Sequence, residues 1–329
     1  MNAERLNRPH VQTRYGIRSV RVPLIGGSVS LAQTNVAQAH PSGLRTGDAW
    51  WWAWHFDPLV ATVLVAWTVL YGRGLWKIWW RAGVGRVVAP WRAIGFLLAV
   101  FSLTVALLSP LDTLSDDLSW VHMTQHMVLM VVAAPLLIAA SPGLVWTWAM
   151  PTKWRKPLGR FLVQLSPASR SFAGALLWNP FLVWALHAIV LWVWHLPVLY
   201  EWALVDPLIH DIEHLSFFLI ACLFWRIVLD TRHGPTLNPG LSVLYLFTTS
   251  LHAMGLGVLM TLSPSAWYGI YVGRTSVWGL SPLEDQQLAG AIMWMPACMA
   301  YAIVAAGIFA NWLNQMDRRV TGYPTTPGD

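Results

Sequence analysis

The chain has 329 residues, of which 56% are apolar and only 11% are charged, and its formal net charge is +6. Such a composition leaves too little polar surface to cover a water-soluble globule, so it predicts a protein that uses lipid as its solvent. The basic residues are scattered through polar loops and are not gathered on one polar domain, which argues against a nucleic-acid partner.

The first 49 residues are predicted to be either a leader or a disordered tail. Three arginines precede a weakly apolar stretch at residues 22–32, and Ala37-Gln38-Ala39 resembles a signal-peptidase cleavage site. The apolar stretch is interrupted by Gly26 and Gly27, so both alternatives stay open.

Residues 50–312 are predicted to form one transmembrane domain of seven helices. A helix needs roughly 20 predominantly apolar residues to cross the hydrocarbon core. The segments that meet this requirement are Asp57–Trp76, Trp91–Ser109, Leu118–Ala140, Trp178–Leu196, Leu208–Leu229, Leu241–Leu262 and Leu288–Trp312. Pro135 removes a backbone donor late in the third segment, where we expect a kink or a helix end. Residues 313–329 are predicted to be a cytoplasmic tail.

The basic residues of the loops predict the orientation of the domain. Fourteen of them lie in the first, third and fifth loops and at the C-terminus, whereas Arg274 is the single basic residue of the other three loops. Lys and Arg concentrate on the cytoplasmic side of multi-pass proteins. The chain is therefore predicted to have its N-terminus outside and its C-terminus in the cytoplasm.

Histidines are concentrated in the half of the membrane that this orientation makes external. His55 precedes the first span, and His122, His195 and His210 are expected within about one helical turn of the outer surface. Four more are expected roughly 10 to 15 Å deep on four different helices, where they could converge: His126, His187, His214 and His252. The spacing of four residues in His122/His126 and in His210/His214 places each pair on one helix face.

These histidines, together with sulfur side chains at similar depth, predict a copper site. Ionisable groups inside a bilayer are costly and usually functional, and imidazole with thioether donors suits Cu(I). Methionines also fill apolar cores without binding anything. The predicted ligands are His122, His126, His195, His210, His214, His252 and Met293.

The sequence His210-Asp211-Ile212-Glu213-His214 also matches H-x-x-E-H, the inverted zinc-protease signature. A catalytic zinc site needs a third protein ligand, and the sequence offers no clear candidate. We therefore expect Glu213 or Asp211 to have a smaller role, which is to accept the second imidazole N–H and fix the tautomer of a metal ligand.

Several blocks of the chain resemble the CtaG family of cytochrome c oxidase assembly proteins. They lie between residues 50 and 312, and they are Ser109-Pro110-Leu111, His122-Met123-x-Gln125-His126-Met127, Ala134-Pro135-Leu136-Leu137, Trp194-His195-x-Pro197-x-x-Tyr200, Glu213-His214, Phe224-Trp225, and Pro282-Leu283-x-Asp285-Gln286-Gln287-Leu288-Ala289-Gly290. The resemblance implies a seven-helix plasma-membrane protein that helps to mature the oxidase, with a copper centre as its target.

The expected function is that of an assembly factor, not an enzyme, which holds Cu(I) and passes it to an oxidase copper centre. Its expected partners are cytochrome c oxidase subunits, the lipid bilayer and other copper chaperones. Two alternatives stay open. Histidines on separate helices could ligate haem iron in an electron carrier, or they could line a proton or ion pathway.

Overall fold

The computed structural model describes residues 54, 56–164, 172–229 and 237–321. The predicted leader or tail and His55 lie outside these ranges. Every regular element within them is helical. The tail predicted from residue 313 begins as a continuation of the last helix as far as Thr321.

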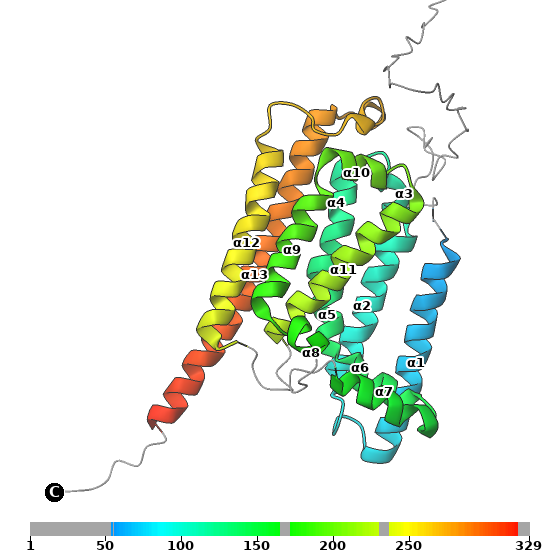
Figure 1. Cartoon of the computed structure of the whole chain (residues 1–329), viewed down its shortest axis with the longest axis vertical. Helices are drawn as coiled ribbons and strands as arrows, with labels where there is room; N and C mark the ends of the chain where they lie inside the picture. The colour runs from blue at the N-terminus through cyan, green and yellow to red at the C-terminus, as the bar shows by residue number, and fades with distance from the viewer. Residues whose placement is uncertain (1–53, 55, 165–171, 230–236, 322–329) are drawn as a thin grey trace, which may run out of the picture. The chain divides into compact units, whose positions relative to one another are not determined.

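Within the described ranges, six helical spans are long and apolar enough to cross a membrane. They are α1 (Pro58–Ala82), α2 (Pro90–Leu108), the Ser119–Ala140 span, α11 (Pro207–Leu229), α12 (Pro239–Thr261) and α13 (Pro282–Thr321). The pair α9 (Pro180–Trp194) and α10 (Pro197–Ala203) meets the same test when the two are taken together. Counting that pair as one span gives seven, so the prediction of an all-helical, multi-pass membrane protein is confirmed (Figure 1). The orientation of the termini stays a prediction.

Most of the long helices begin at a proline because proline lacks the N–H that a first helical turn leaves unpaired. In α1, the Asp57 side chain caps the helix by accepting hydrogen bonds from the backbone N–H groups of Leu59 (2.6 Å) and Val60 (2.9 Å). Asn179 and Asn238 cap α9 and α12 in the same way. These caps explain why the observed helix starts lie close to the predicted ones.

The Ser119–Ala140 span contains a π-helical segment and does not end at Pro135. It consists of α4 (Ser119–Met127), the π-helix η2 (Val128–Ala133) and α5 (Ala134–Ala140). A π-turn accommodates one extra residue, and it tolerates the absence of the hydrogen bond that proline cannot donate. The helix therefore continues through Pro135, and the widened segment begins two residues after His126.

The fourth span is broken where α9 meets α10, with a bend of 77° between them. Pro197 occupies the first turn of α10, and His195 is the C-terminal cap of α9. Because α9 has only 15 residues, it is about 22 Å long at 1.5 Å per residue and is too short to span the membrane alone. This break turns His195 into the interior of the bundle.

Close packing of α13 against α12 and α4 anchors the helices of the site. Figure 1 shows α12 and α13 side by side. A Cβ atom on Gly290 would lie 2.6 Å from the Gly257 carbonyl oxygen, so only glycine allows this approach. The Asp285 carboxylate accepts hydrogen bonds from the backbone N–H groups of Ser119 (2.8 Å) and Trp120 (3.2 Å). It thereby caps α4, the helix that carries His122 and His126.

Short helices lie in the described residues before the third span and in those between the third and fourth spans. They are α3 (Pro110–Ser115) before α4, and α6 (Pro142–Ala149), α7 (Thr152–Gln164) and α8 (Phe172–Leu177) before α9. α7 combines exposed Trp154 and Phe161 side chains with four basic residues. That mixture is typical of a helix lying in the membrane interface.

Candidate metal centre

Two helices each supply a pair of histidines one turn apart. On α4, the rings of His122 and His126 have centroids 4.2 Å apart, and on α11 those of His210 and His214 are 4.1 Å apart. The two pairs face each other, with 5.5 Å between the His122 and His210 centroids and 5.3 Å between those of His126 and His214. The predicted pairing of imidazoles on helix faces therefore produces one cluster of four rings.

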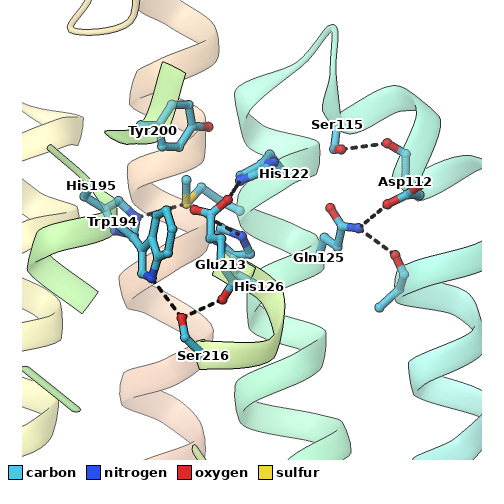
Figure 2. A network of polar contacts seen from close by, with 12 residues as sticks. Asp112, Ser115, His122, Gln125, His126, Trp194, His195, Tyr200, Glu213 and Ser216 are labelled. Carbon is cyan, nitrogen blue, oxygen red and sulfur yellow. Dashed lines mark hydrogen bonds and ion pairs between the residues drawn. The ribbon is translucent and has the colours of Figure 1, made fainter. Parts of the chain in front are cut away.

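The Glu213 carboxylate, which belongs to α11, lies against both histidines of the α4 pair (Figure 2). One carboxylate oxygen is 3.6 Å from Nε2 of His122, and the other is 3.8 Å from Nε2 of His126. Ligand atoms of His122, His210, Glu213 and His214 all lie within 4.8 Å of one another. Four donor atoms in so small a volume can bind a single metal ion. We refer to these four residues as the His/Glu site.

The His/Glu site is buried and its polar atoms are poorly satisfied. Glu213 and His122 are fully buried, with 0% of their surfaces exposed. Neither carboxylate oxygen of Glu213 has a hydrogen-bond partner, nor does either ring nitrogen of His122 or Nε2 of His214. Burying polar groups unpaired costs about 1 to 3 kcal/mol each, and more for charged groups. A cation held between the carboxylate and the imidazoles would offset this cost.

A softer pair of donors adjoins the site on the side of α9. Nδ1 of His195 lies 2.7 Å from the Leu191 carbonyl oxygen, and Nε2 lies 3.4 Å from the Met123 sulfur. A carbonyl oxygen only accepts, so Nδ1 carries the proton and the neutral ring presents the lone pair of Nε2 to a thioether that also lacks a proton. Two such lone-pair donors suit a soft cation. The His126 ring lies 6.5 Å from that of His195 and 5.3 Å from that of His214, so it is near both the soft pair and the His/Glu site.

Hydrogen bonds to neighbouring helices fix the helices that carry these ligands. Trp194 Nε1 donates to the Ser216 hydroxyl (2.8 Å), which donates to the Glu213 backbone carbonyl (2.8 Å), as Figure 2 shows. On the other side, Gln125 Nε2 donates to the Asp112 carboxylate (2.7 Å) and to the Ala106 carbonyl (2.8 Å). The two helices that carry the ligands are therefore held by hydrogen bonds to α9 on one side and to α2 and α3 on the other.

Three tyrosines cover the end of the site nearest α10. Tyr200 stacks on Tyr268 with ring centroids 3.8 Å apart, and its ring lies 5.2 Å from that of His122. The hydroxyls of Tyr200 and Tyr271 are 3.0 Å apart, and Tyr271 donates to the Ser115 carbonyl (3.2 Å). Tyr268 donates to the His195 backbone carbonyl (3.1 Å). This aromatic layer shields the site from that side.

A small cavity reaches His210 and His214 from the flank formed by α1, α2, α3 and α11. Its volume is about 60 Å³, and its lining includes the carboxylates of Asp57, Asp112 and Asp211. This volume suits a metal ion or one or two waters. It is far below the roughly 300 Å³ at which pockets for small organic ligands begin. The negative side chains favour the passage of a cation.

The structure distributes the seven predicted ligands over three places. It brings together His122, His126, His210 and His214, and it places His195 beside them. His252 instead faces His187, with ring centroids 5.4 Å apart. Met293 is buried in the apolar core of α13, and its ligand role stays a prediction. Of the four deep histidines that could converge, His126 and His214 therefore lie in one cluster, whereas His187 and His252 face each other.

Glu213 is the ligand candidate that sequence reasoning placed in a lesser role. Its position three residues after His210 is the signal that indicates a shared helix face. The third imidazole that the H-x-x-E-H motif lacked in the sequence comes from His122 on α4. The cavity beside it, however, is too small for a peptide substrate.

Comparison with known proteins agrees with the resemblance seen in the sequence blocks. No curated protein and no solved structure gives a significant match to the chain. Residues 69–315 match the family described as cytochrome c oxidase caa3 assembly factor, and this range contains every residue of the His/Glu site and of the soft pair. The chain therefore belongs to the Caa3_CtaG family of cytochrome c oxidase assembly factors.

Proposed function

We propose that this assembly factor binds copper at the His/Glu site and delivers it to a copper centre of the oxidase. The observation that carries the proposal is the convergence of His122, His210, Glu213 and His214 within 4.8 Å. The family assignment supplies the oxidase as the object of assembly. Copper is then cargo, and the protein acts as a carrier without catalysing a reaction.

The donor set favours copper over other metals. Imidazole binds copper, zinc, iron and nickel, whereas a thioether selects soft ions such as Cu(I). The soft pair of Met123 and His195 lies next to the His/Glu site. A copper ion that moves from one to the other therefore exchanges hard donors for soft ones. Zinc would be satisfied by the His/Glu site alone and would have no use for Met123.

Transfer would proceed by exchange of ligands between neighbouring donors. His126 is within 3.8 Å of the Glu213 carboxylate, and its ring also lies near that of His195. An imidazole in that position can replace one ligand of the His/Glu site while a second ligand is recruited from the soft pair. Comparable donors on both sides keep the steps of such an exchange nearly balanced in free energy, so the ion is held without being trapped.

The expected setting is the bacterial plasma membrane, with the N-terminus outside. Lys and Arg are concentrated in the loops at the α6–α8 end of the bundle, which favours a cytoplasmic location for that end. The His/Glu site would then lie near the outer surface, close to the copper centres of the oxidase subunits. Other copper chaperones on that side are the expected donors of the ion.

The cavity argues against a haem carrier and against a proteolytic zinc site. A haem group needs several times the volume of the 60 Å³ cavity beside His210 and His214. A proteolytic zinc site needs room for a substrate beside its water, and the tyrosine layer and the cavity leave none. A purified sample with a haem absorption band and stoichiometric iron would instead support the electron carrier.

The proposal is tested in a strain that lacks the gene. We expect oxidase polypeptides to be made but oxidase activity to be lost, with partial rescue by added copper. Complementation by the wild-type chain should restore activity, whereas His122→Ala and His214→Ala should not, although both proteins reach the membrane in normal amount. Cys298→Ala is the control for copper bound adventitiously by a thiol. The Cys298 sulfur accepts a hydrogen bond from the Ser250 hydroxyl and belongs to neither the His/Glu site nor the soft pair. Full activity in the deletion strain, or in the histidine variants, would overturn the proposal.

A further inference from the structure

A second pair of histidines faces each other inside the bundle, away from the His/Glu site. His187 on α9 and His252 on α12 have ring centroids 5.4 Å apart, with the ring planes 66° to each other. His187 is 1% exposed and His252 is partly buried. The rings of Phe224 and Trp184 lie 5.2 Å from His187 and 5.8 Å from His252, respectively. The pair is thus enclosed largely by aromatic side chains.

None of the four ring nitrogens of this pair has a hydrogen-bond partner. A structural pair of histidines would use one N–H to donate to the other ring or to a carbonyl, because polar contacts between membrane helices are what justify burying such groups. Here the ring nitrogens of both imidazoles are buried and unpaired, on two different helices. Leaving them so costs about 1 to 3 kcal/mol for each unpaired group, which indicates that something else engages them.

The pair is separate from the His/Glu site. His187 precedes His195 by eight residues on α9, which corresponds to about 12 Å along the helix. His252 belongs to α12, a helix that contributes no ligand to the His/Glu site. An ion bound at the pair would therefore not share ligands with the first site.

We propose that His187 and His252 form a second Cu(I) site with two nitrogen ligands. The proposal rests on the proposed function only for the identity of the metal. Metal–nitrogen bonds are about 2.0 to 2.1 Å long, so two imidazoles in line on one ion have ring centroids about 6 Å apart. The observed 5.4 Å approaches this value.

The surroundings of the pair select a monovalent, soft ion. Zinc prefers four ligands, often including anionic ones, whereas Cu(I) accepts two neutral nitrogens. A single positive charge is also the least costly to bury in an apolar site. The pair would serve as a holding site for copper deeper in the bundle than the His/Glu site and the soft pair.

The test measures Cu(I) bound to the full-length protein, purified in detergent under anaerobic, reducing conditions. Competition with a chromophoric chelator should give two copper ions per wild-type chain. It should give one ion for His187→Ala/His252→Ala and one for His122→Ala/His214→Ala. Tyr245→Phe is the matched control, because it removes a hydroxyl from a side chain of α12 that stacks on Phe224, the neighbour of His187. This variant should still bind two copper ions.

X-ray absorption of copper in the His122→Ala/His214→Ala protein identifies the remaining site even if the other double variant does not fold. We expect two nitrogen neighbours, no sulfur neighbour and the strong pre-edge feature of two-coordinate Cu(I). One copper per wild-type chain that is lost only with His122 and His214 would overturn this inference and leave the proposed function standing. One copper lost only with His187 and His252 would do the reverse. A sulfur neighbour in the spectrum would also overturn the two-nitrogen site.

Discussion

Replacing Glu213 with glutamine should weaken copper binding without destabilising the metal-free protein. The substitution keeps the size and one oxygen ligand of the side chain and removes its charge. The carboxylate is fully buried, and it lies 3.6 and 3.8 Å from the imidazole nitrogens of His122 and His126. A role in metal binding and a purely structural role therefore predict opposite changes in stability.

The size of the effect on binding follows from the charge. Two unit charges 4 Å apart attract by about 4 kcal/mol at the effective dielectric constant of 20 that suits protein sites. Each 1.4 kcal/mol is tenfold in Kd, so the upper limit is nearly a thousandfold weaker binding. The glutamine oxygen keeps part of the interaction, and we expect Kd for Cu(I) to rise between about a hundredfold and a thousandfold.

The effect on stability has the other sign. The metal-free wild type buries a carboxylate whose oxygens have no hydrogen-bond partner, which is unfavourable. A neutral glutamine is easier to bury, and its amide can donate to His122 or His126. The melting temperature of the metal-free variant should therefore equal or exceed that of the wild type.

The assay combines a chelator competition for Cu(I) with thermal unfolding of the metal-free protein in detergent. Glu284→Gln is the matched control, because it makes the same chemical change on an exposed side chain that caps α13 through Ser281. Unchanged copper affinity in Glu213→Gln would contradict a ligand role for the Glu213 carboxylate. So would a melting temperature that falls together with the affinity, because that result is expected of a structural carboxylate.

Three further predictions concern packing, pH and orientation. Gly290→Ala should lower the melting temperature by an amount equivalent to about 1 to 3 kcal/mol, because its Cβ would lie 2.6 Å from the Gly257 oxygen. Gly307→Ala on the same helix is the control, because its Cβ would meet open space and the change should be neutral or stabilising. Equal melting temperatures for the two variants would contradict the close packing of α12 on α13. Burial and the neighbouring Asp112 carboxylate raise the pKa of Asp116 from 3.8 to about 7, although Arg274 acts in the opposite direction. The contribution of Asp116 to the stability of the fold is therefore complete below about pH 3.8, and it is lost as the pH rises through about 7. The melting temperature of Asp116→Asn relative to wild type should accordingly rise between pH 4 and pH 8, and a difference independent of pH would refute the shift. Alkaline-phosphatase fusions should be active after Leu204 and Arg274 and inactive after Arg86 and Arg160, and a reversed pattern would place the His/Glu site on the cytoplasmic side.

The histidine pairs of α4 and α11 could be predicted from the sequence because they depend only on helical periodicity. Residues four apart lie on one face whatever the tertiary structure, and burying imidazole in lipid requires a partner. His122, His126, His210 and His214 therefore converge as expected. Glu213 lies on the same face as His210, yet a carboxylate adjacent to a histidine is also the usual partner of a ligand's second nitrogen. Only the position of α4 distinguishes the two roles.

The pairing of His187 with His252 could not be predicted because it depends on how α9 and α12 face each other. Helical periodicity gives the face of each histidine on its own helix but not the neighbouring helix that the face meets. The 77° bend after α9 lies at His195, whose Nε2 is 3.4 Å from the Met123 sulfur, whereas His187 lies about 12 Å away along α9. The proline at the start of α10 indicates a possible break, but it does not give its angle.

The support of the site by Asp285 is also a tertiary feature. Asp285 caps α4 from a position 166 residues further along the chain than Ser119, and no local pattern reports such a contact. Pro135 shows the opposite limit, because its chemistry is clear from the sequence while the π-helical segment that accommodates it depends on packing against α2 and α11.

The most direct test of the account is to locate copper in the purified protein by anomalous diffraction at the copper edge, with the wild-type chain and His122→Ala/His214→Ala compared. We expect an anomalous peak in contact with His122, His210, Glu213 and His214 in the wild type, and its loss in the variant. Copper bound elsewhere with this cluster empty, or zinc bound here in place of copper after growth with both metals, would contradict it.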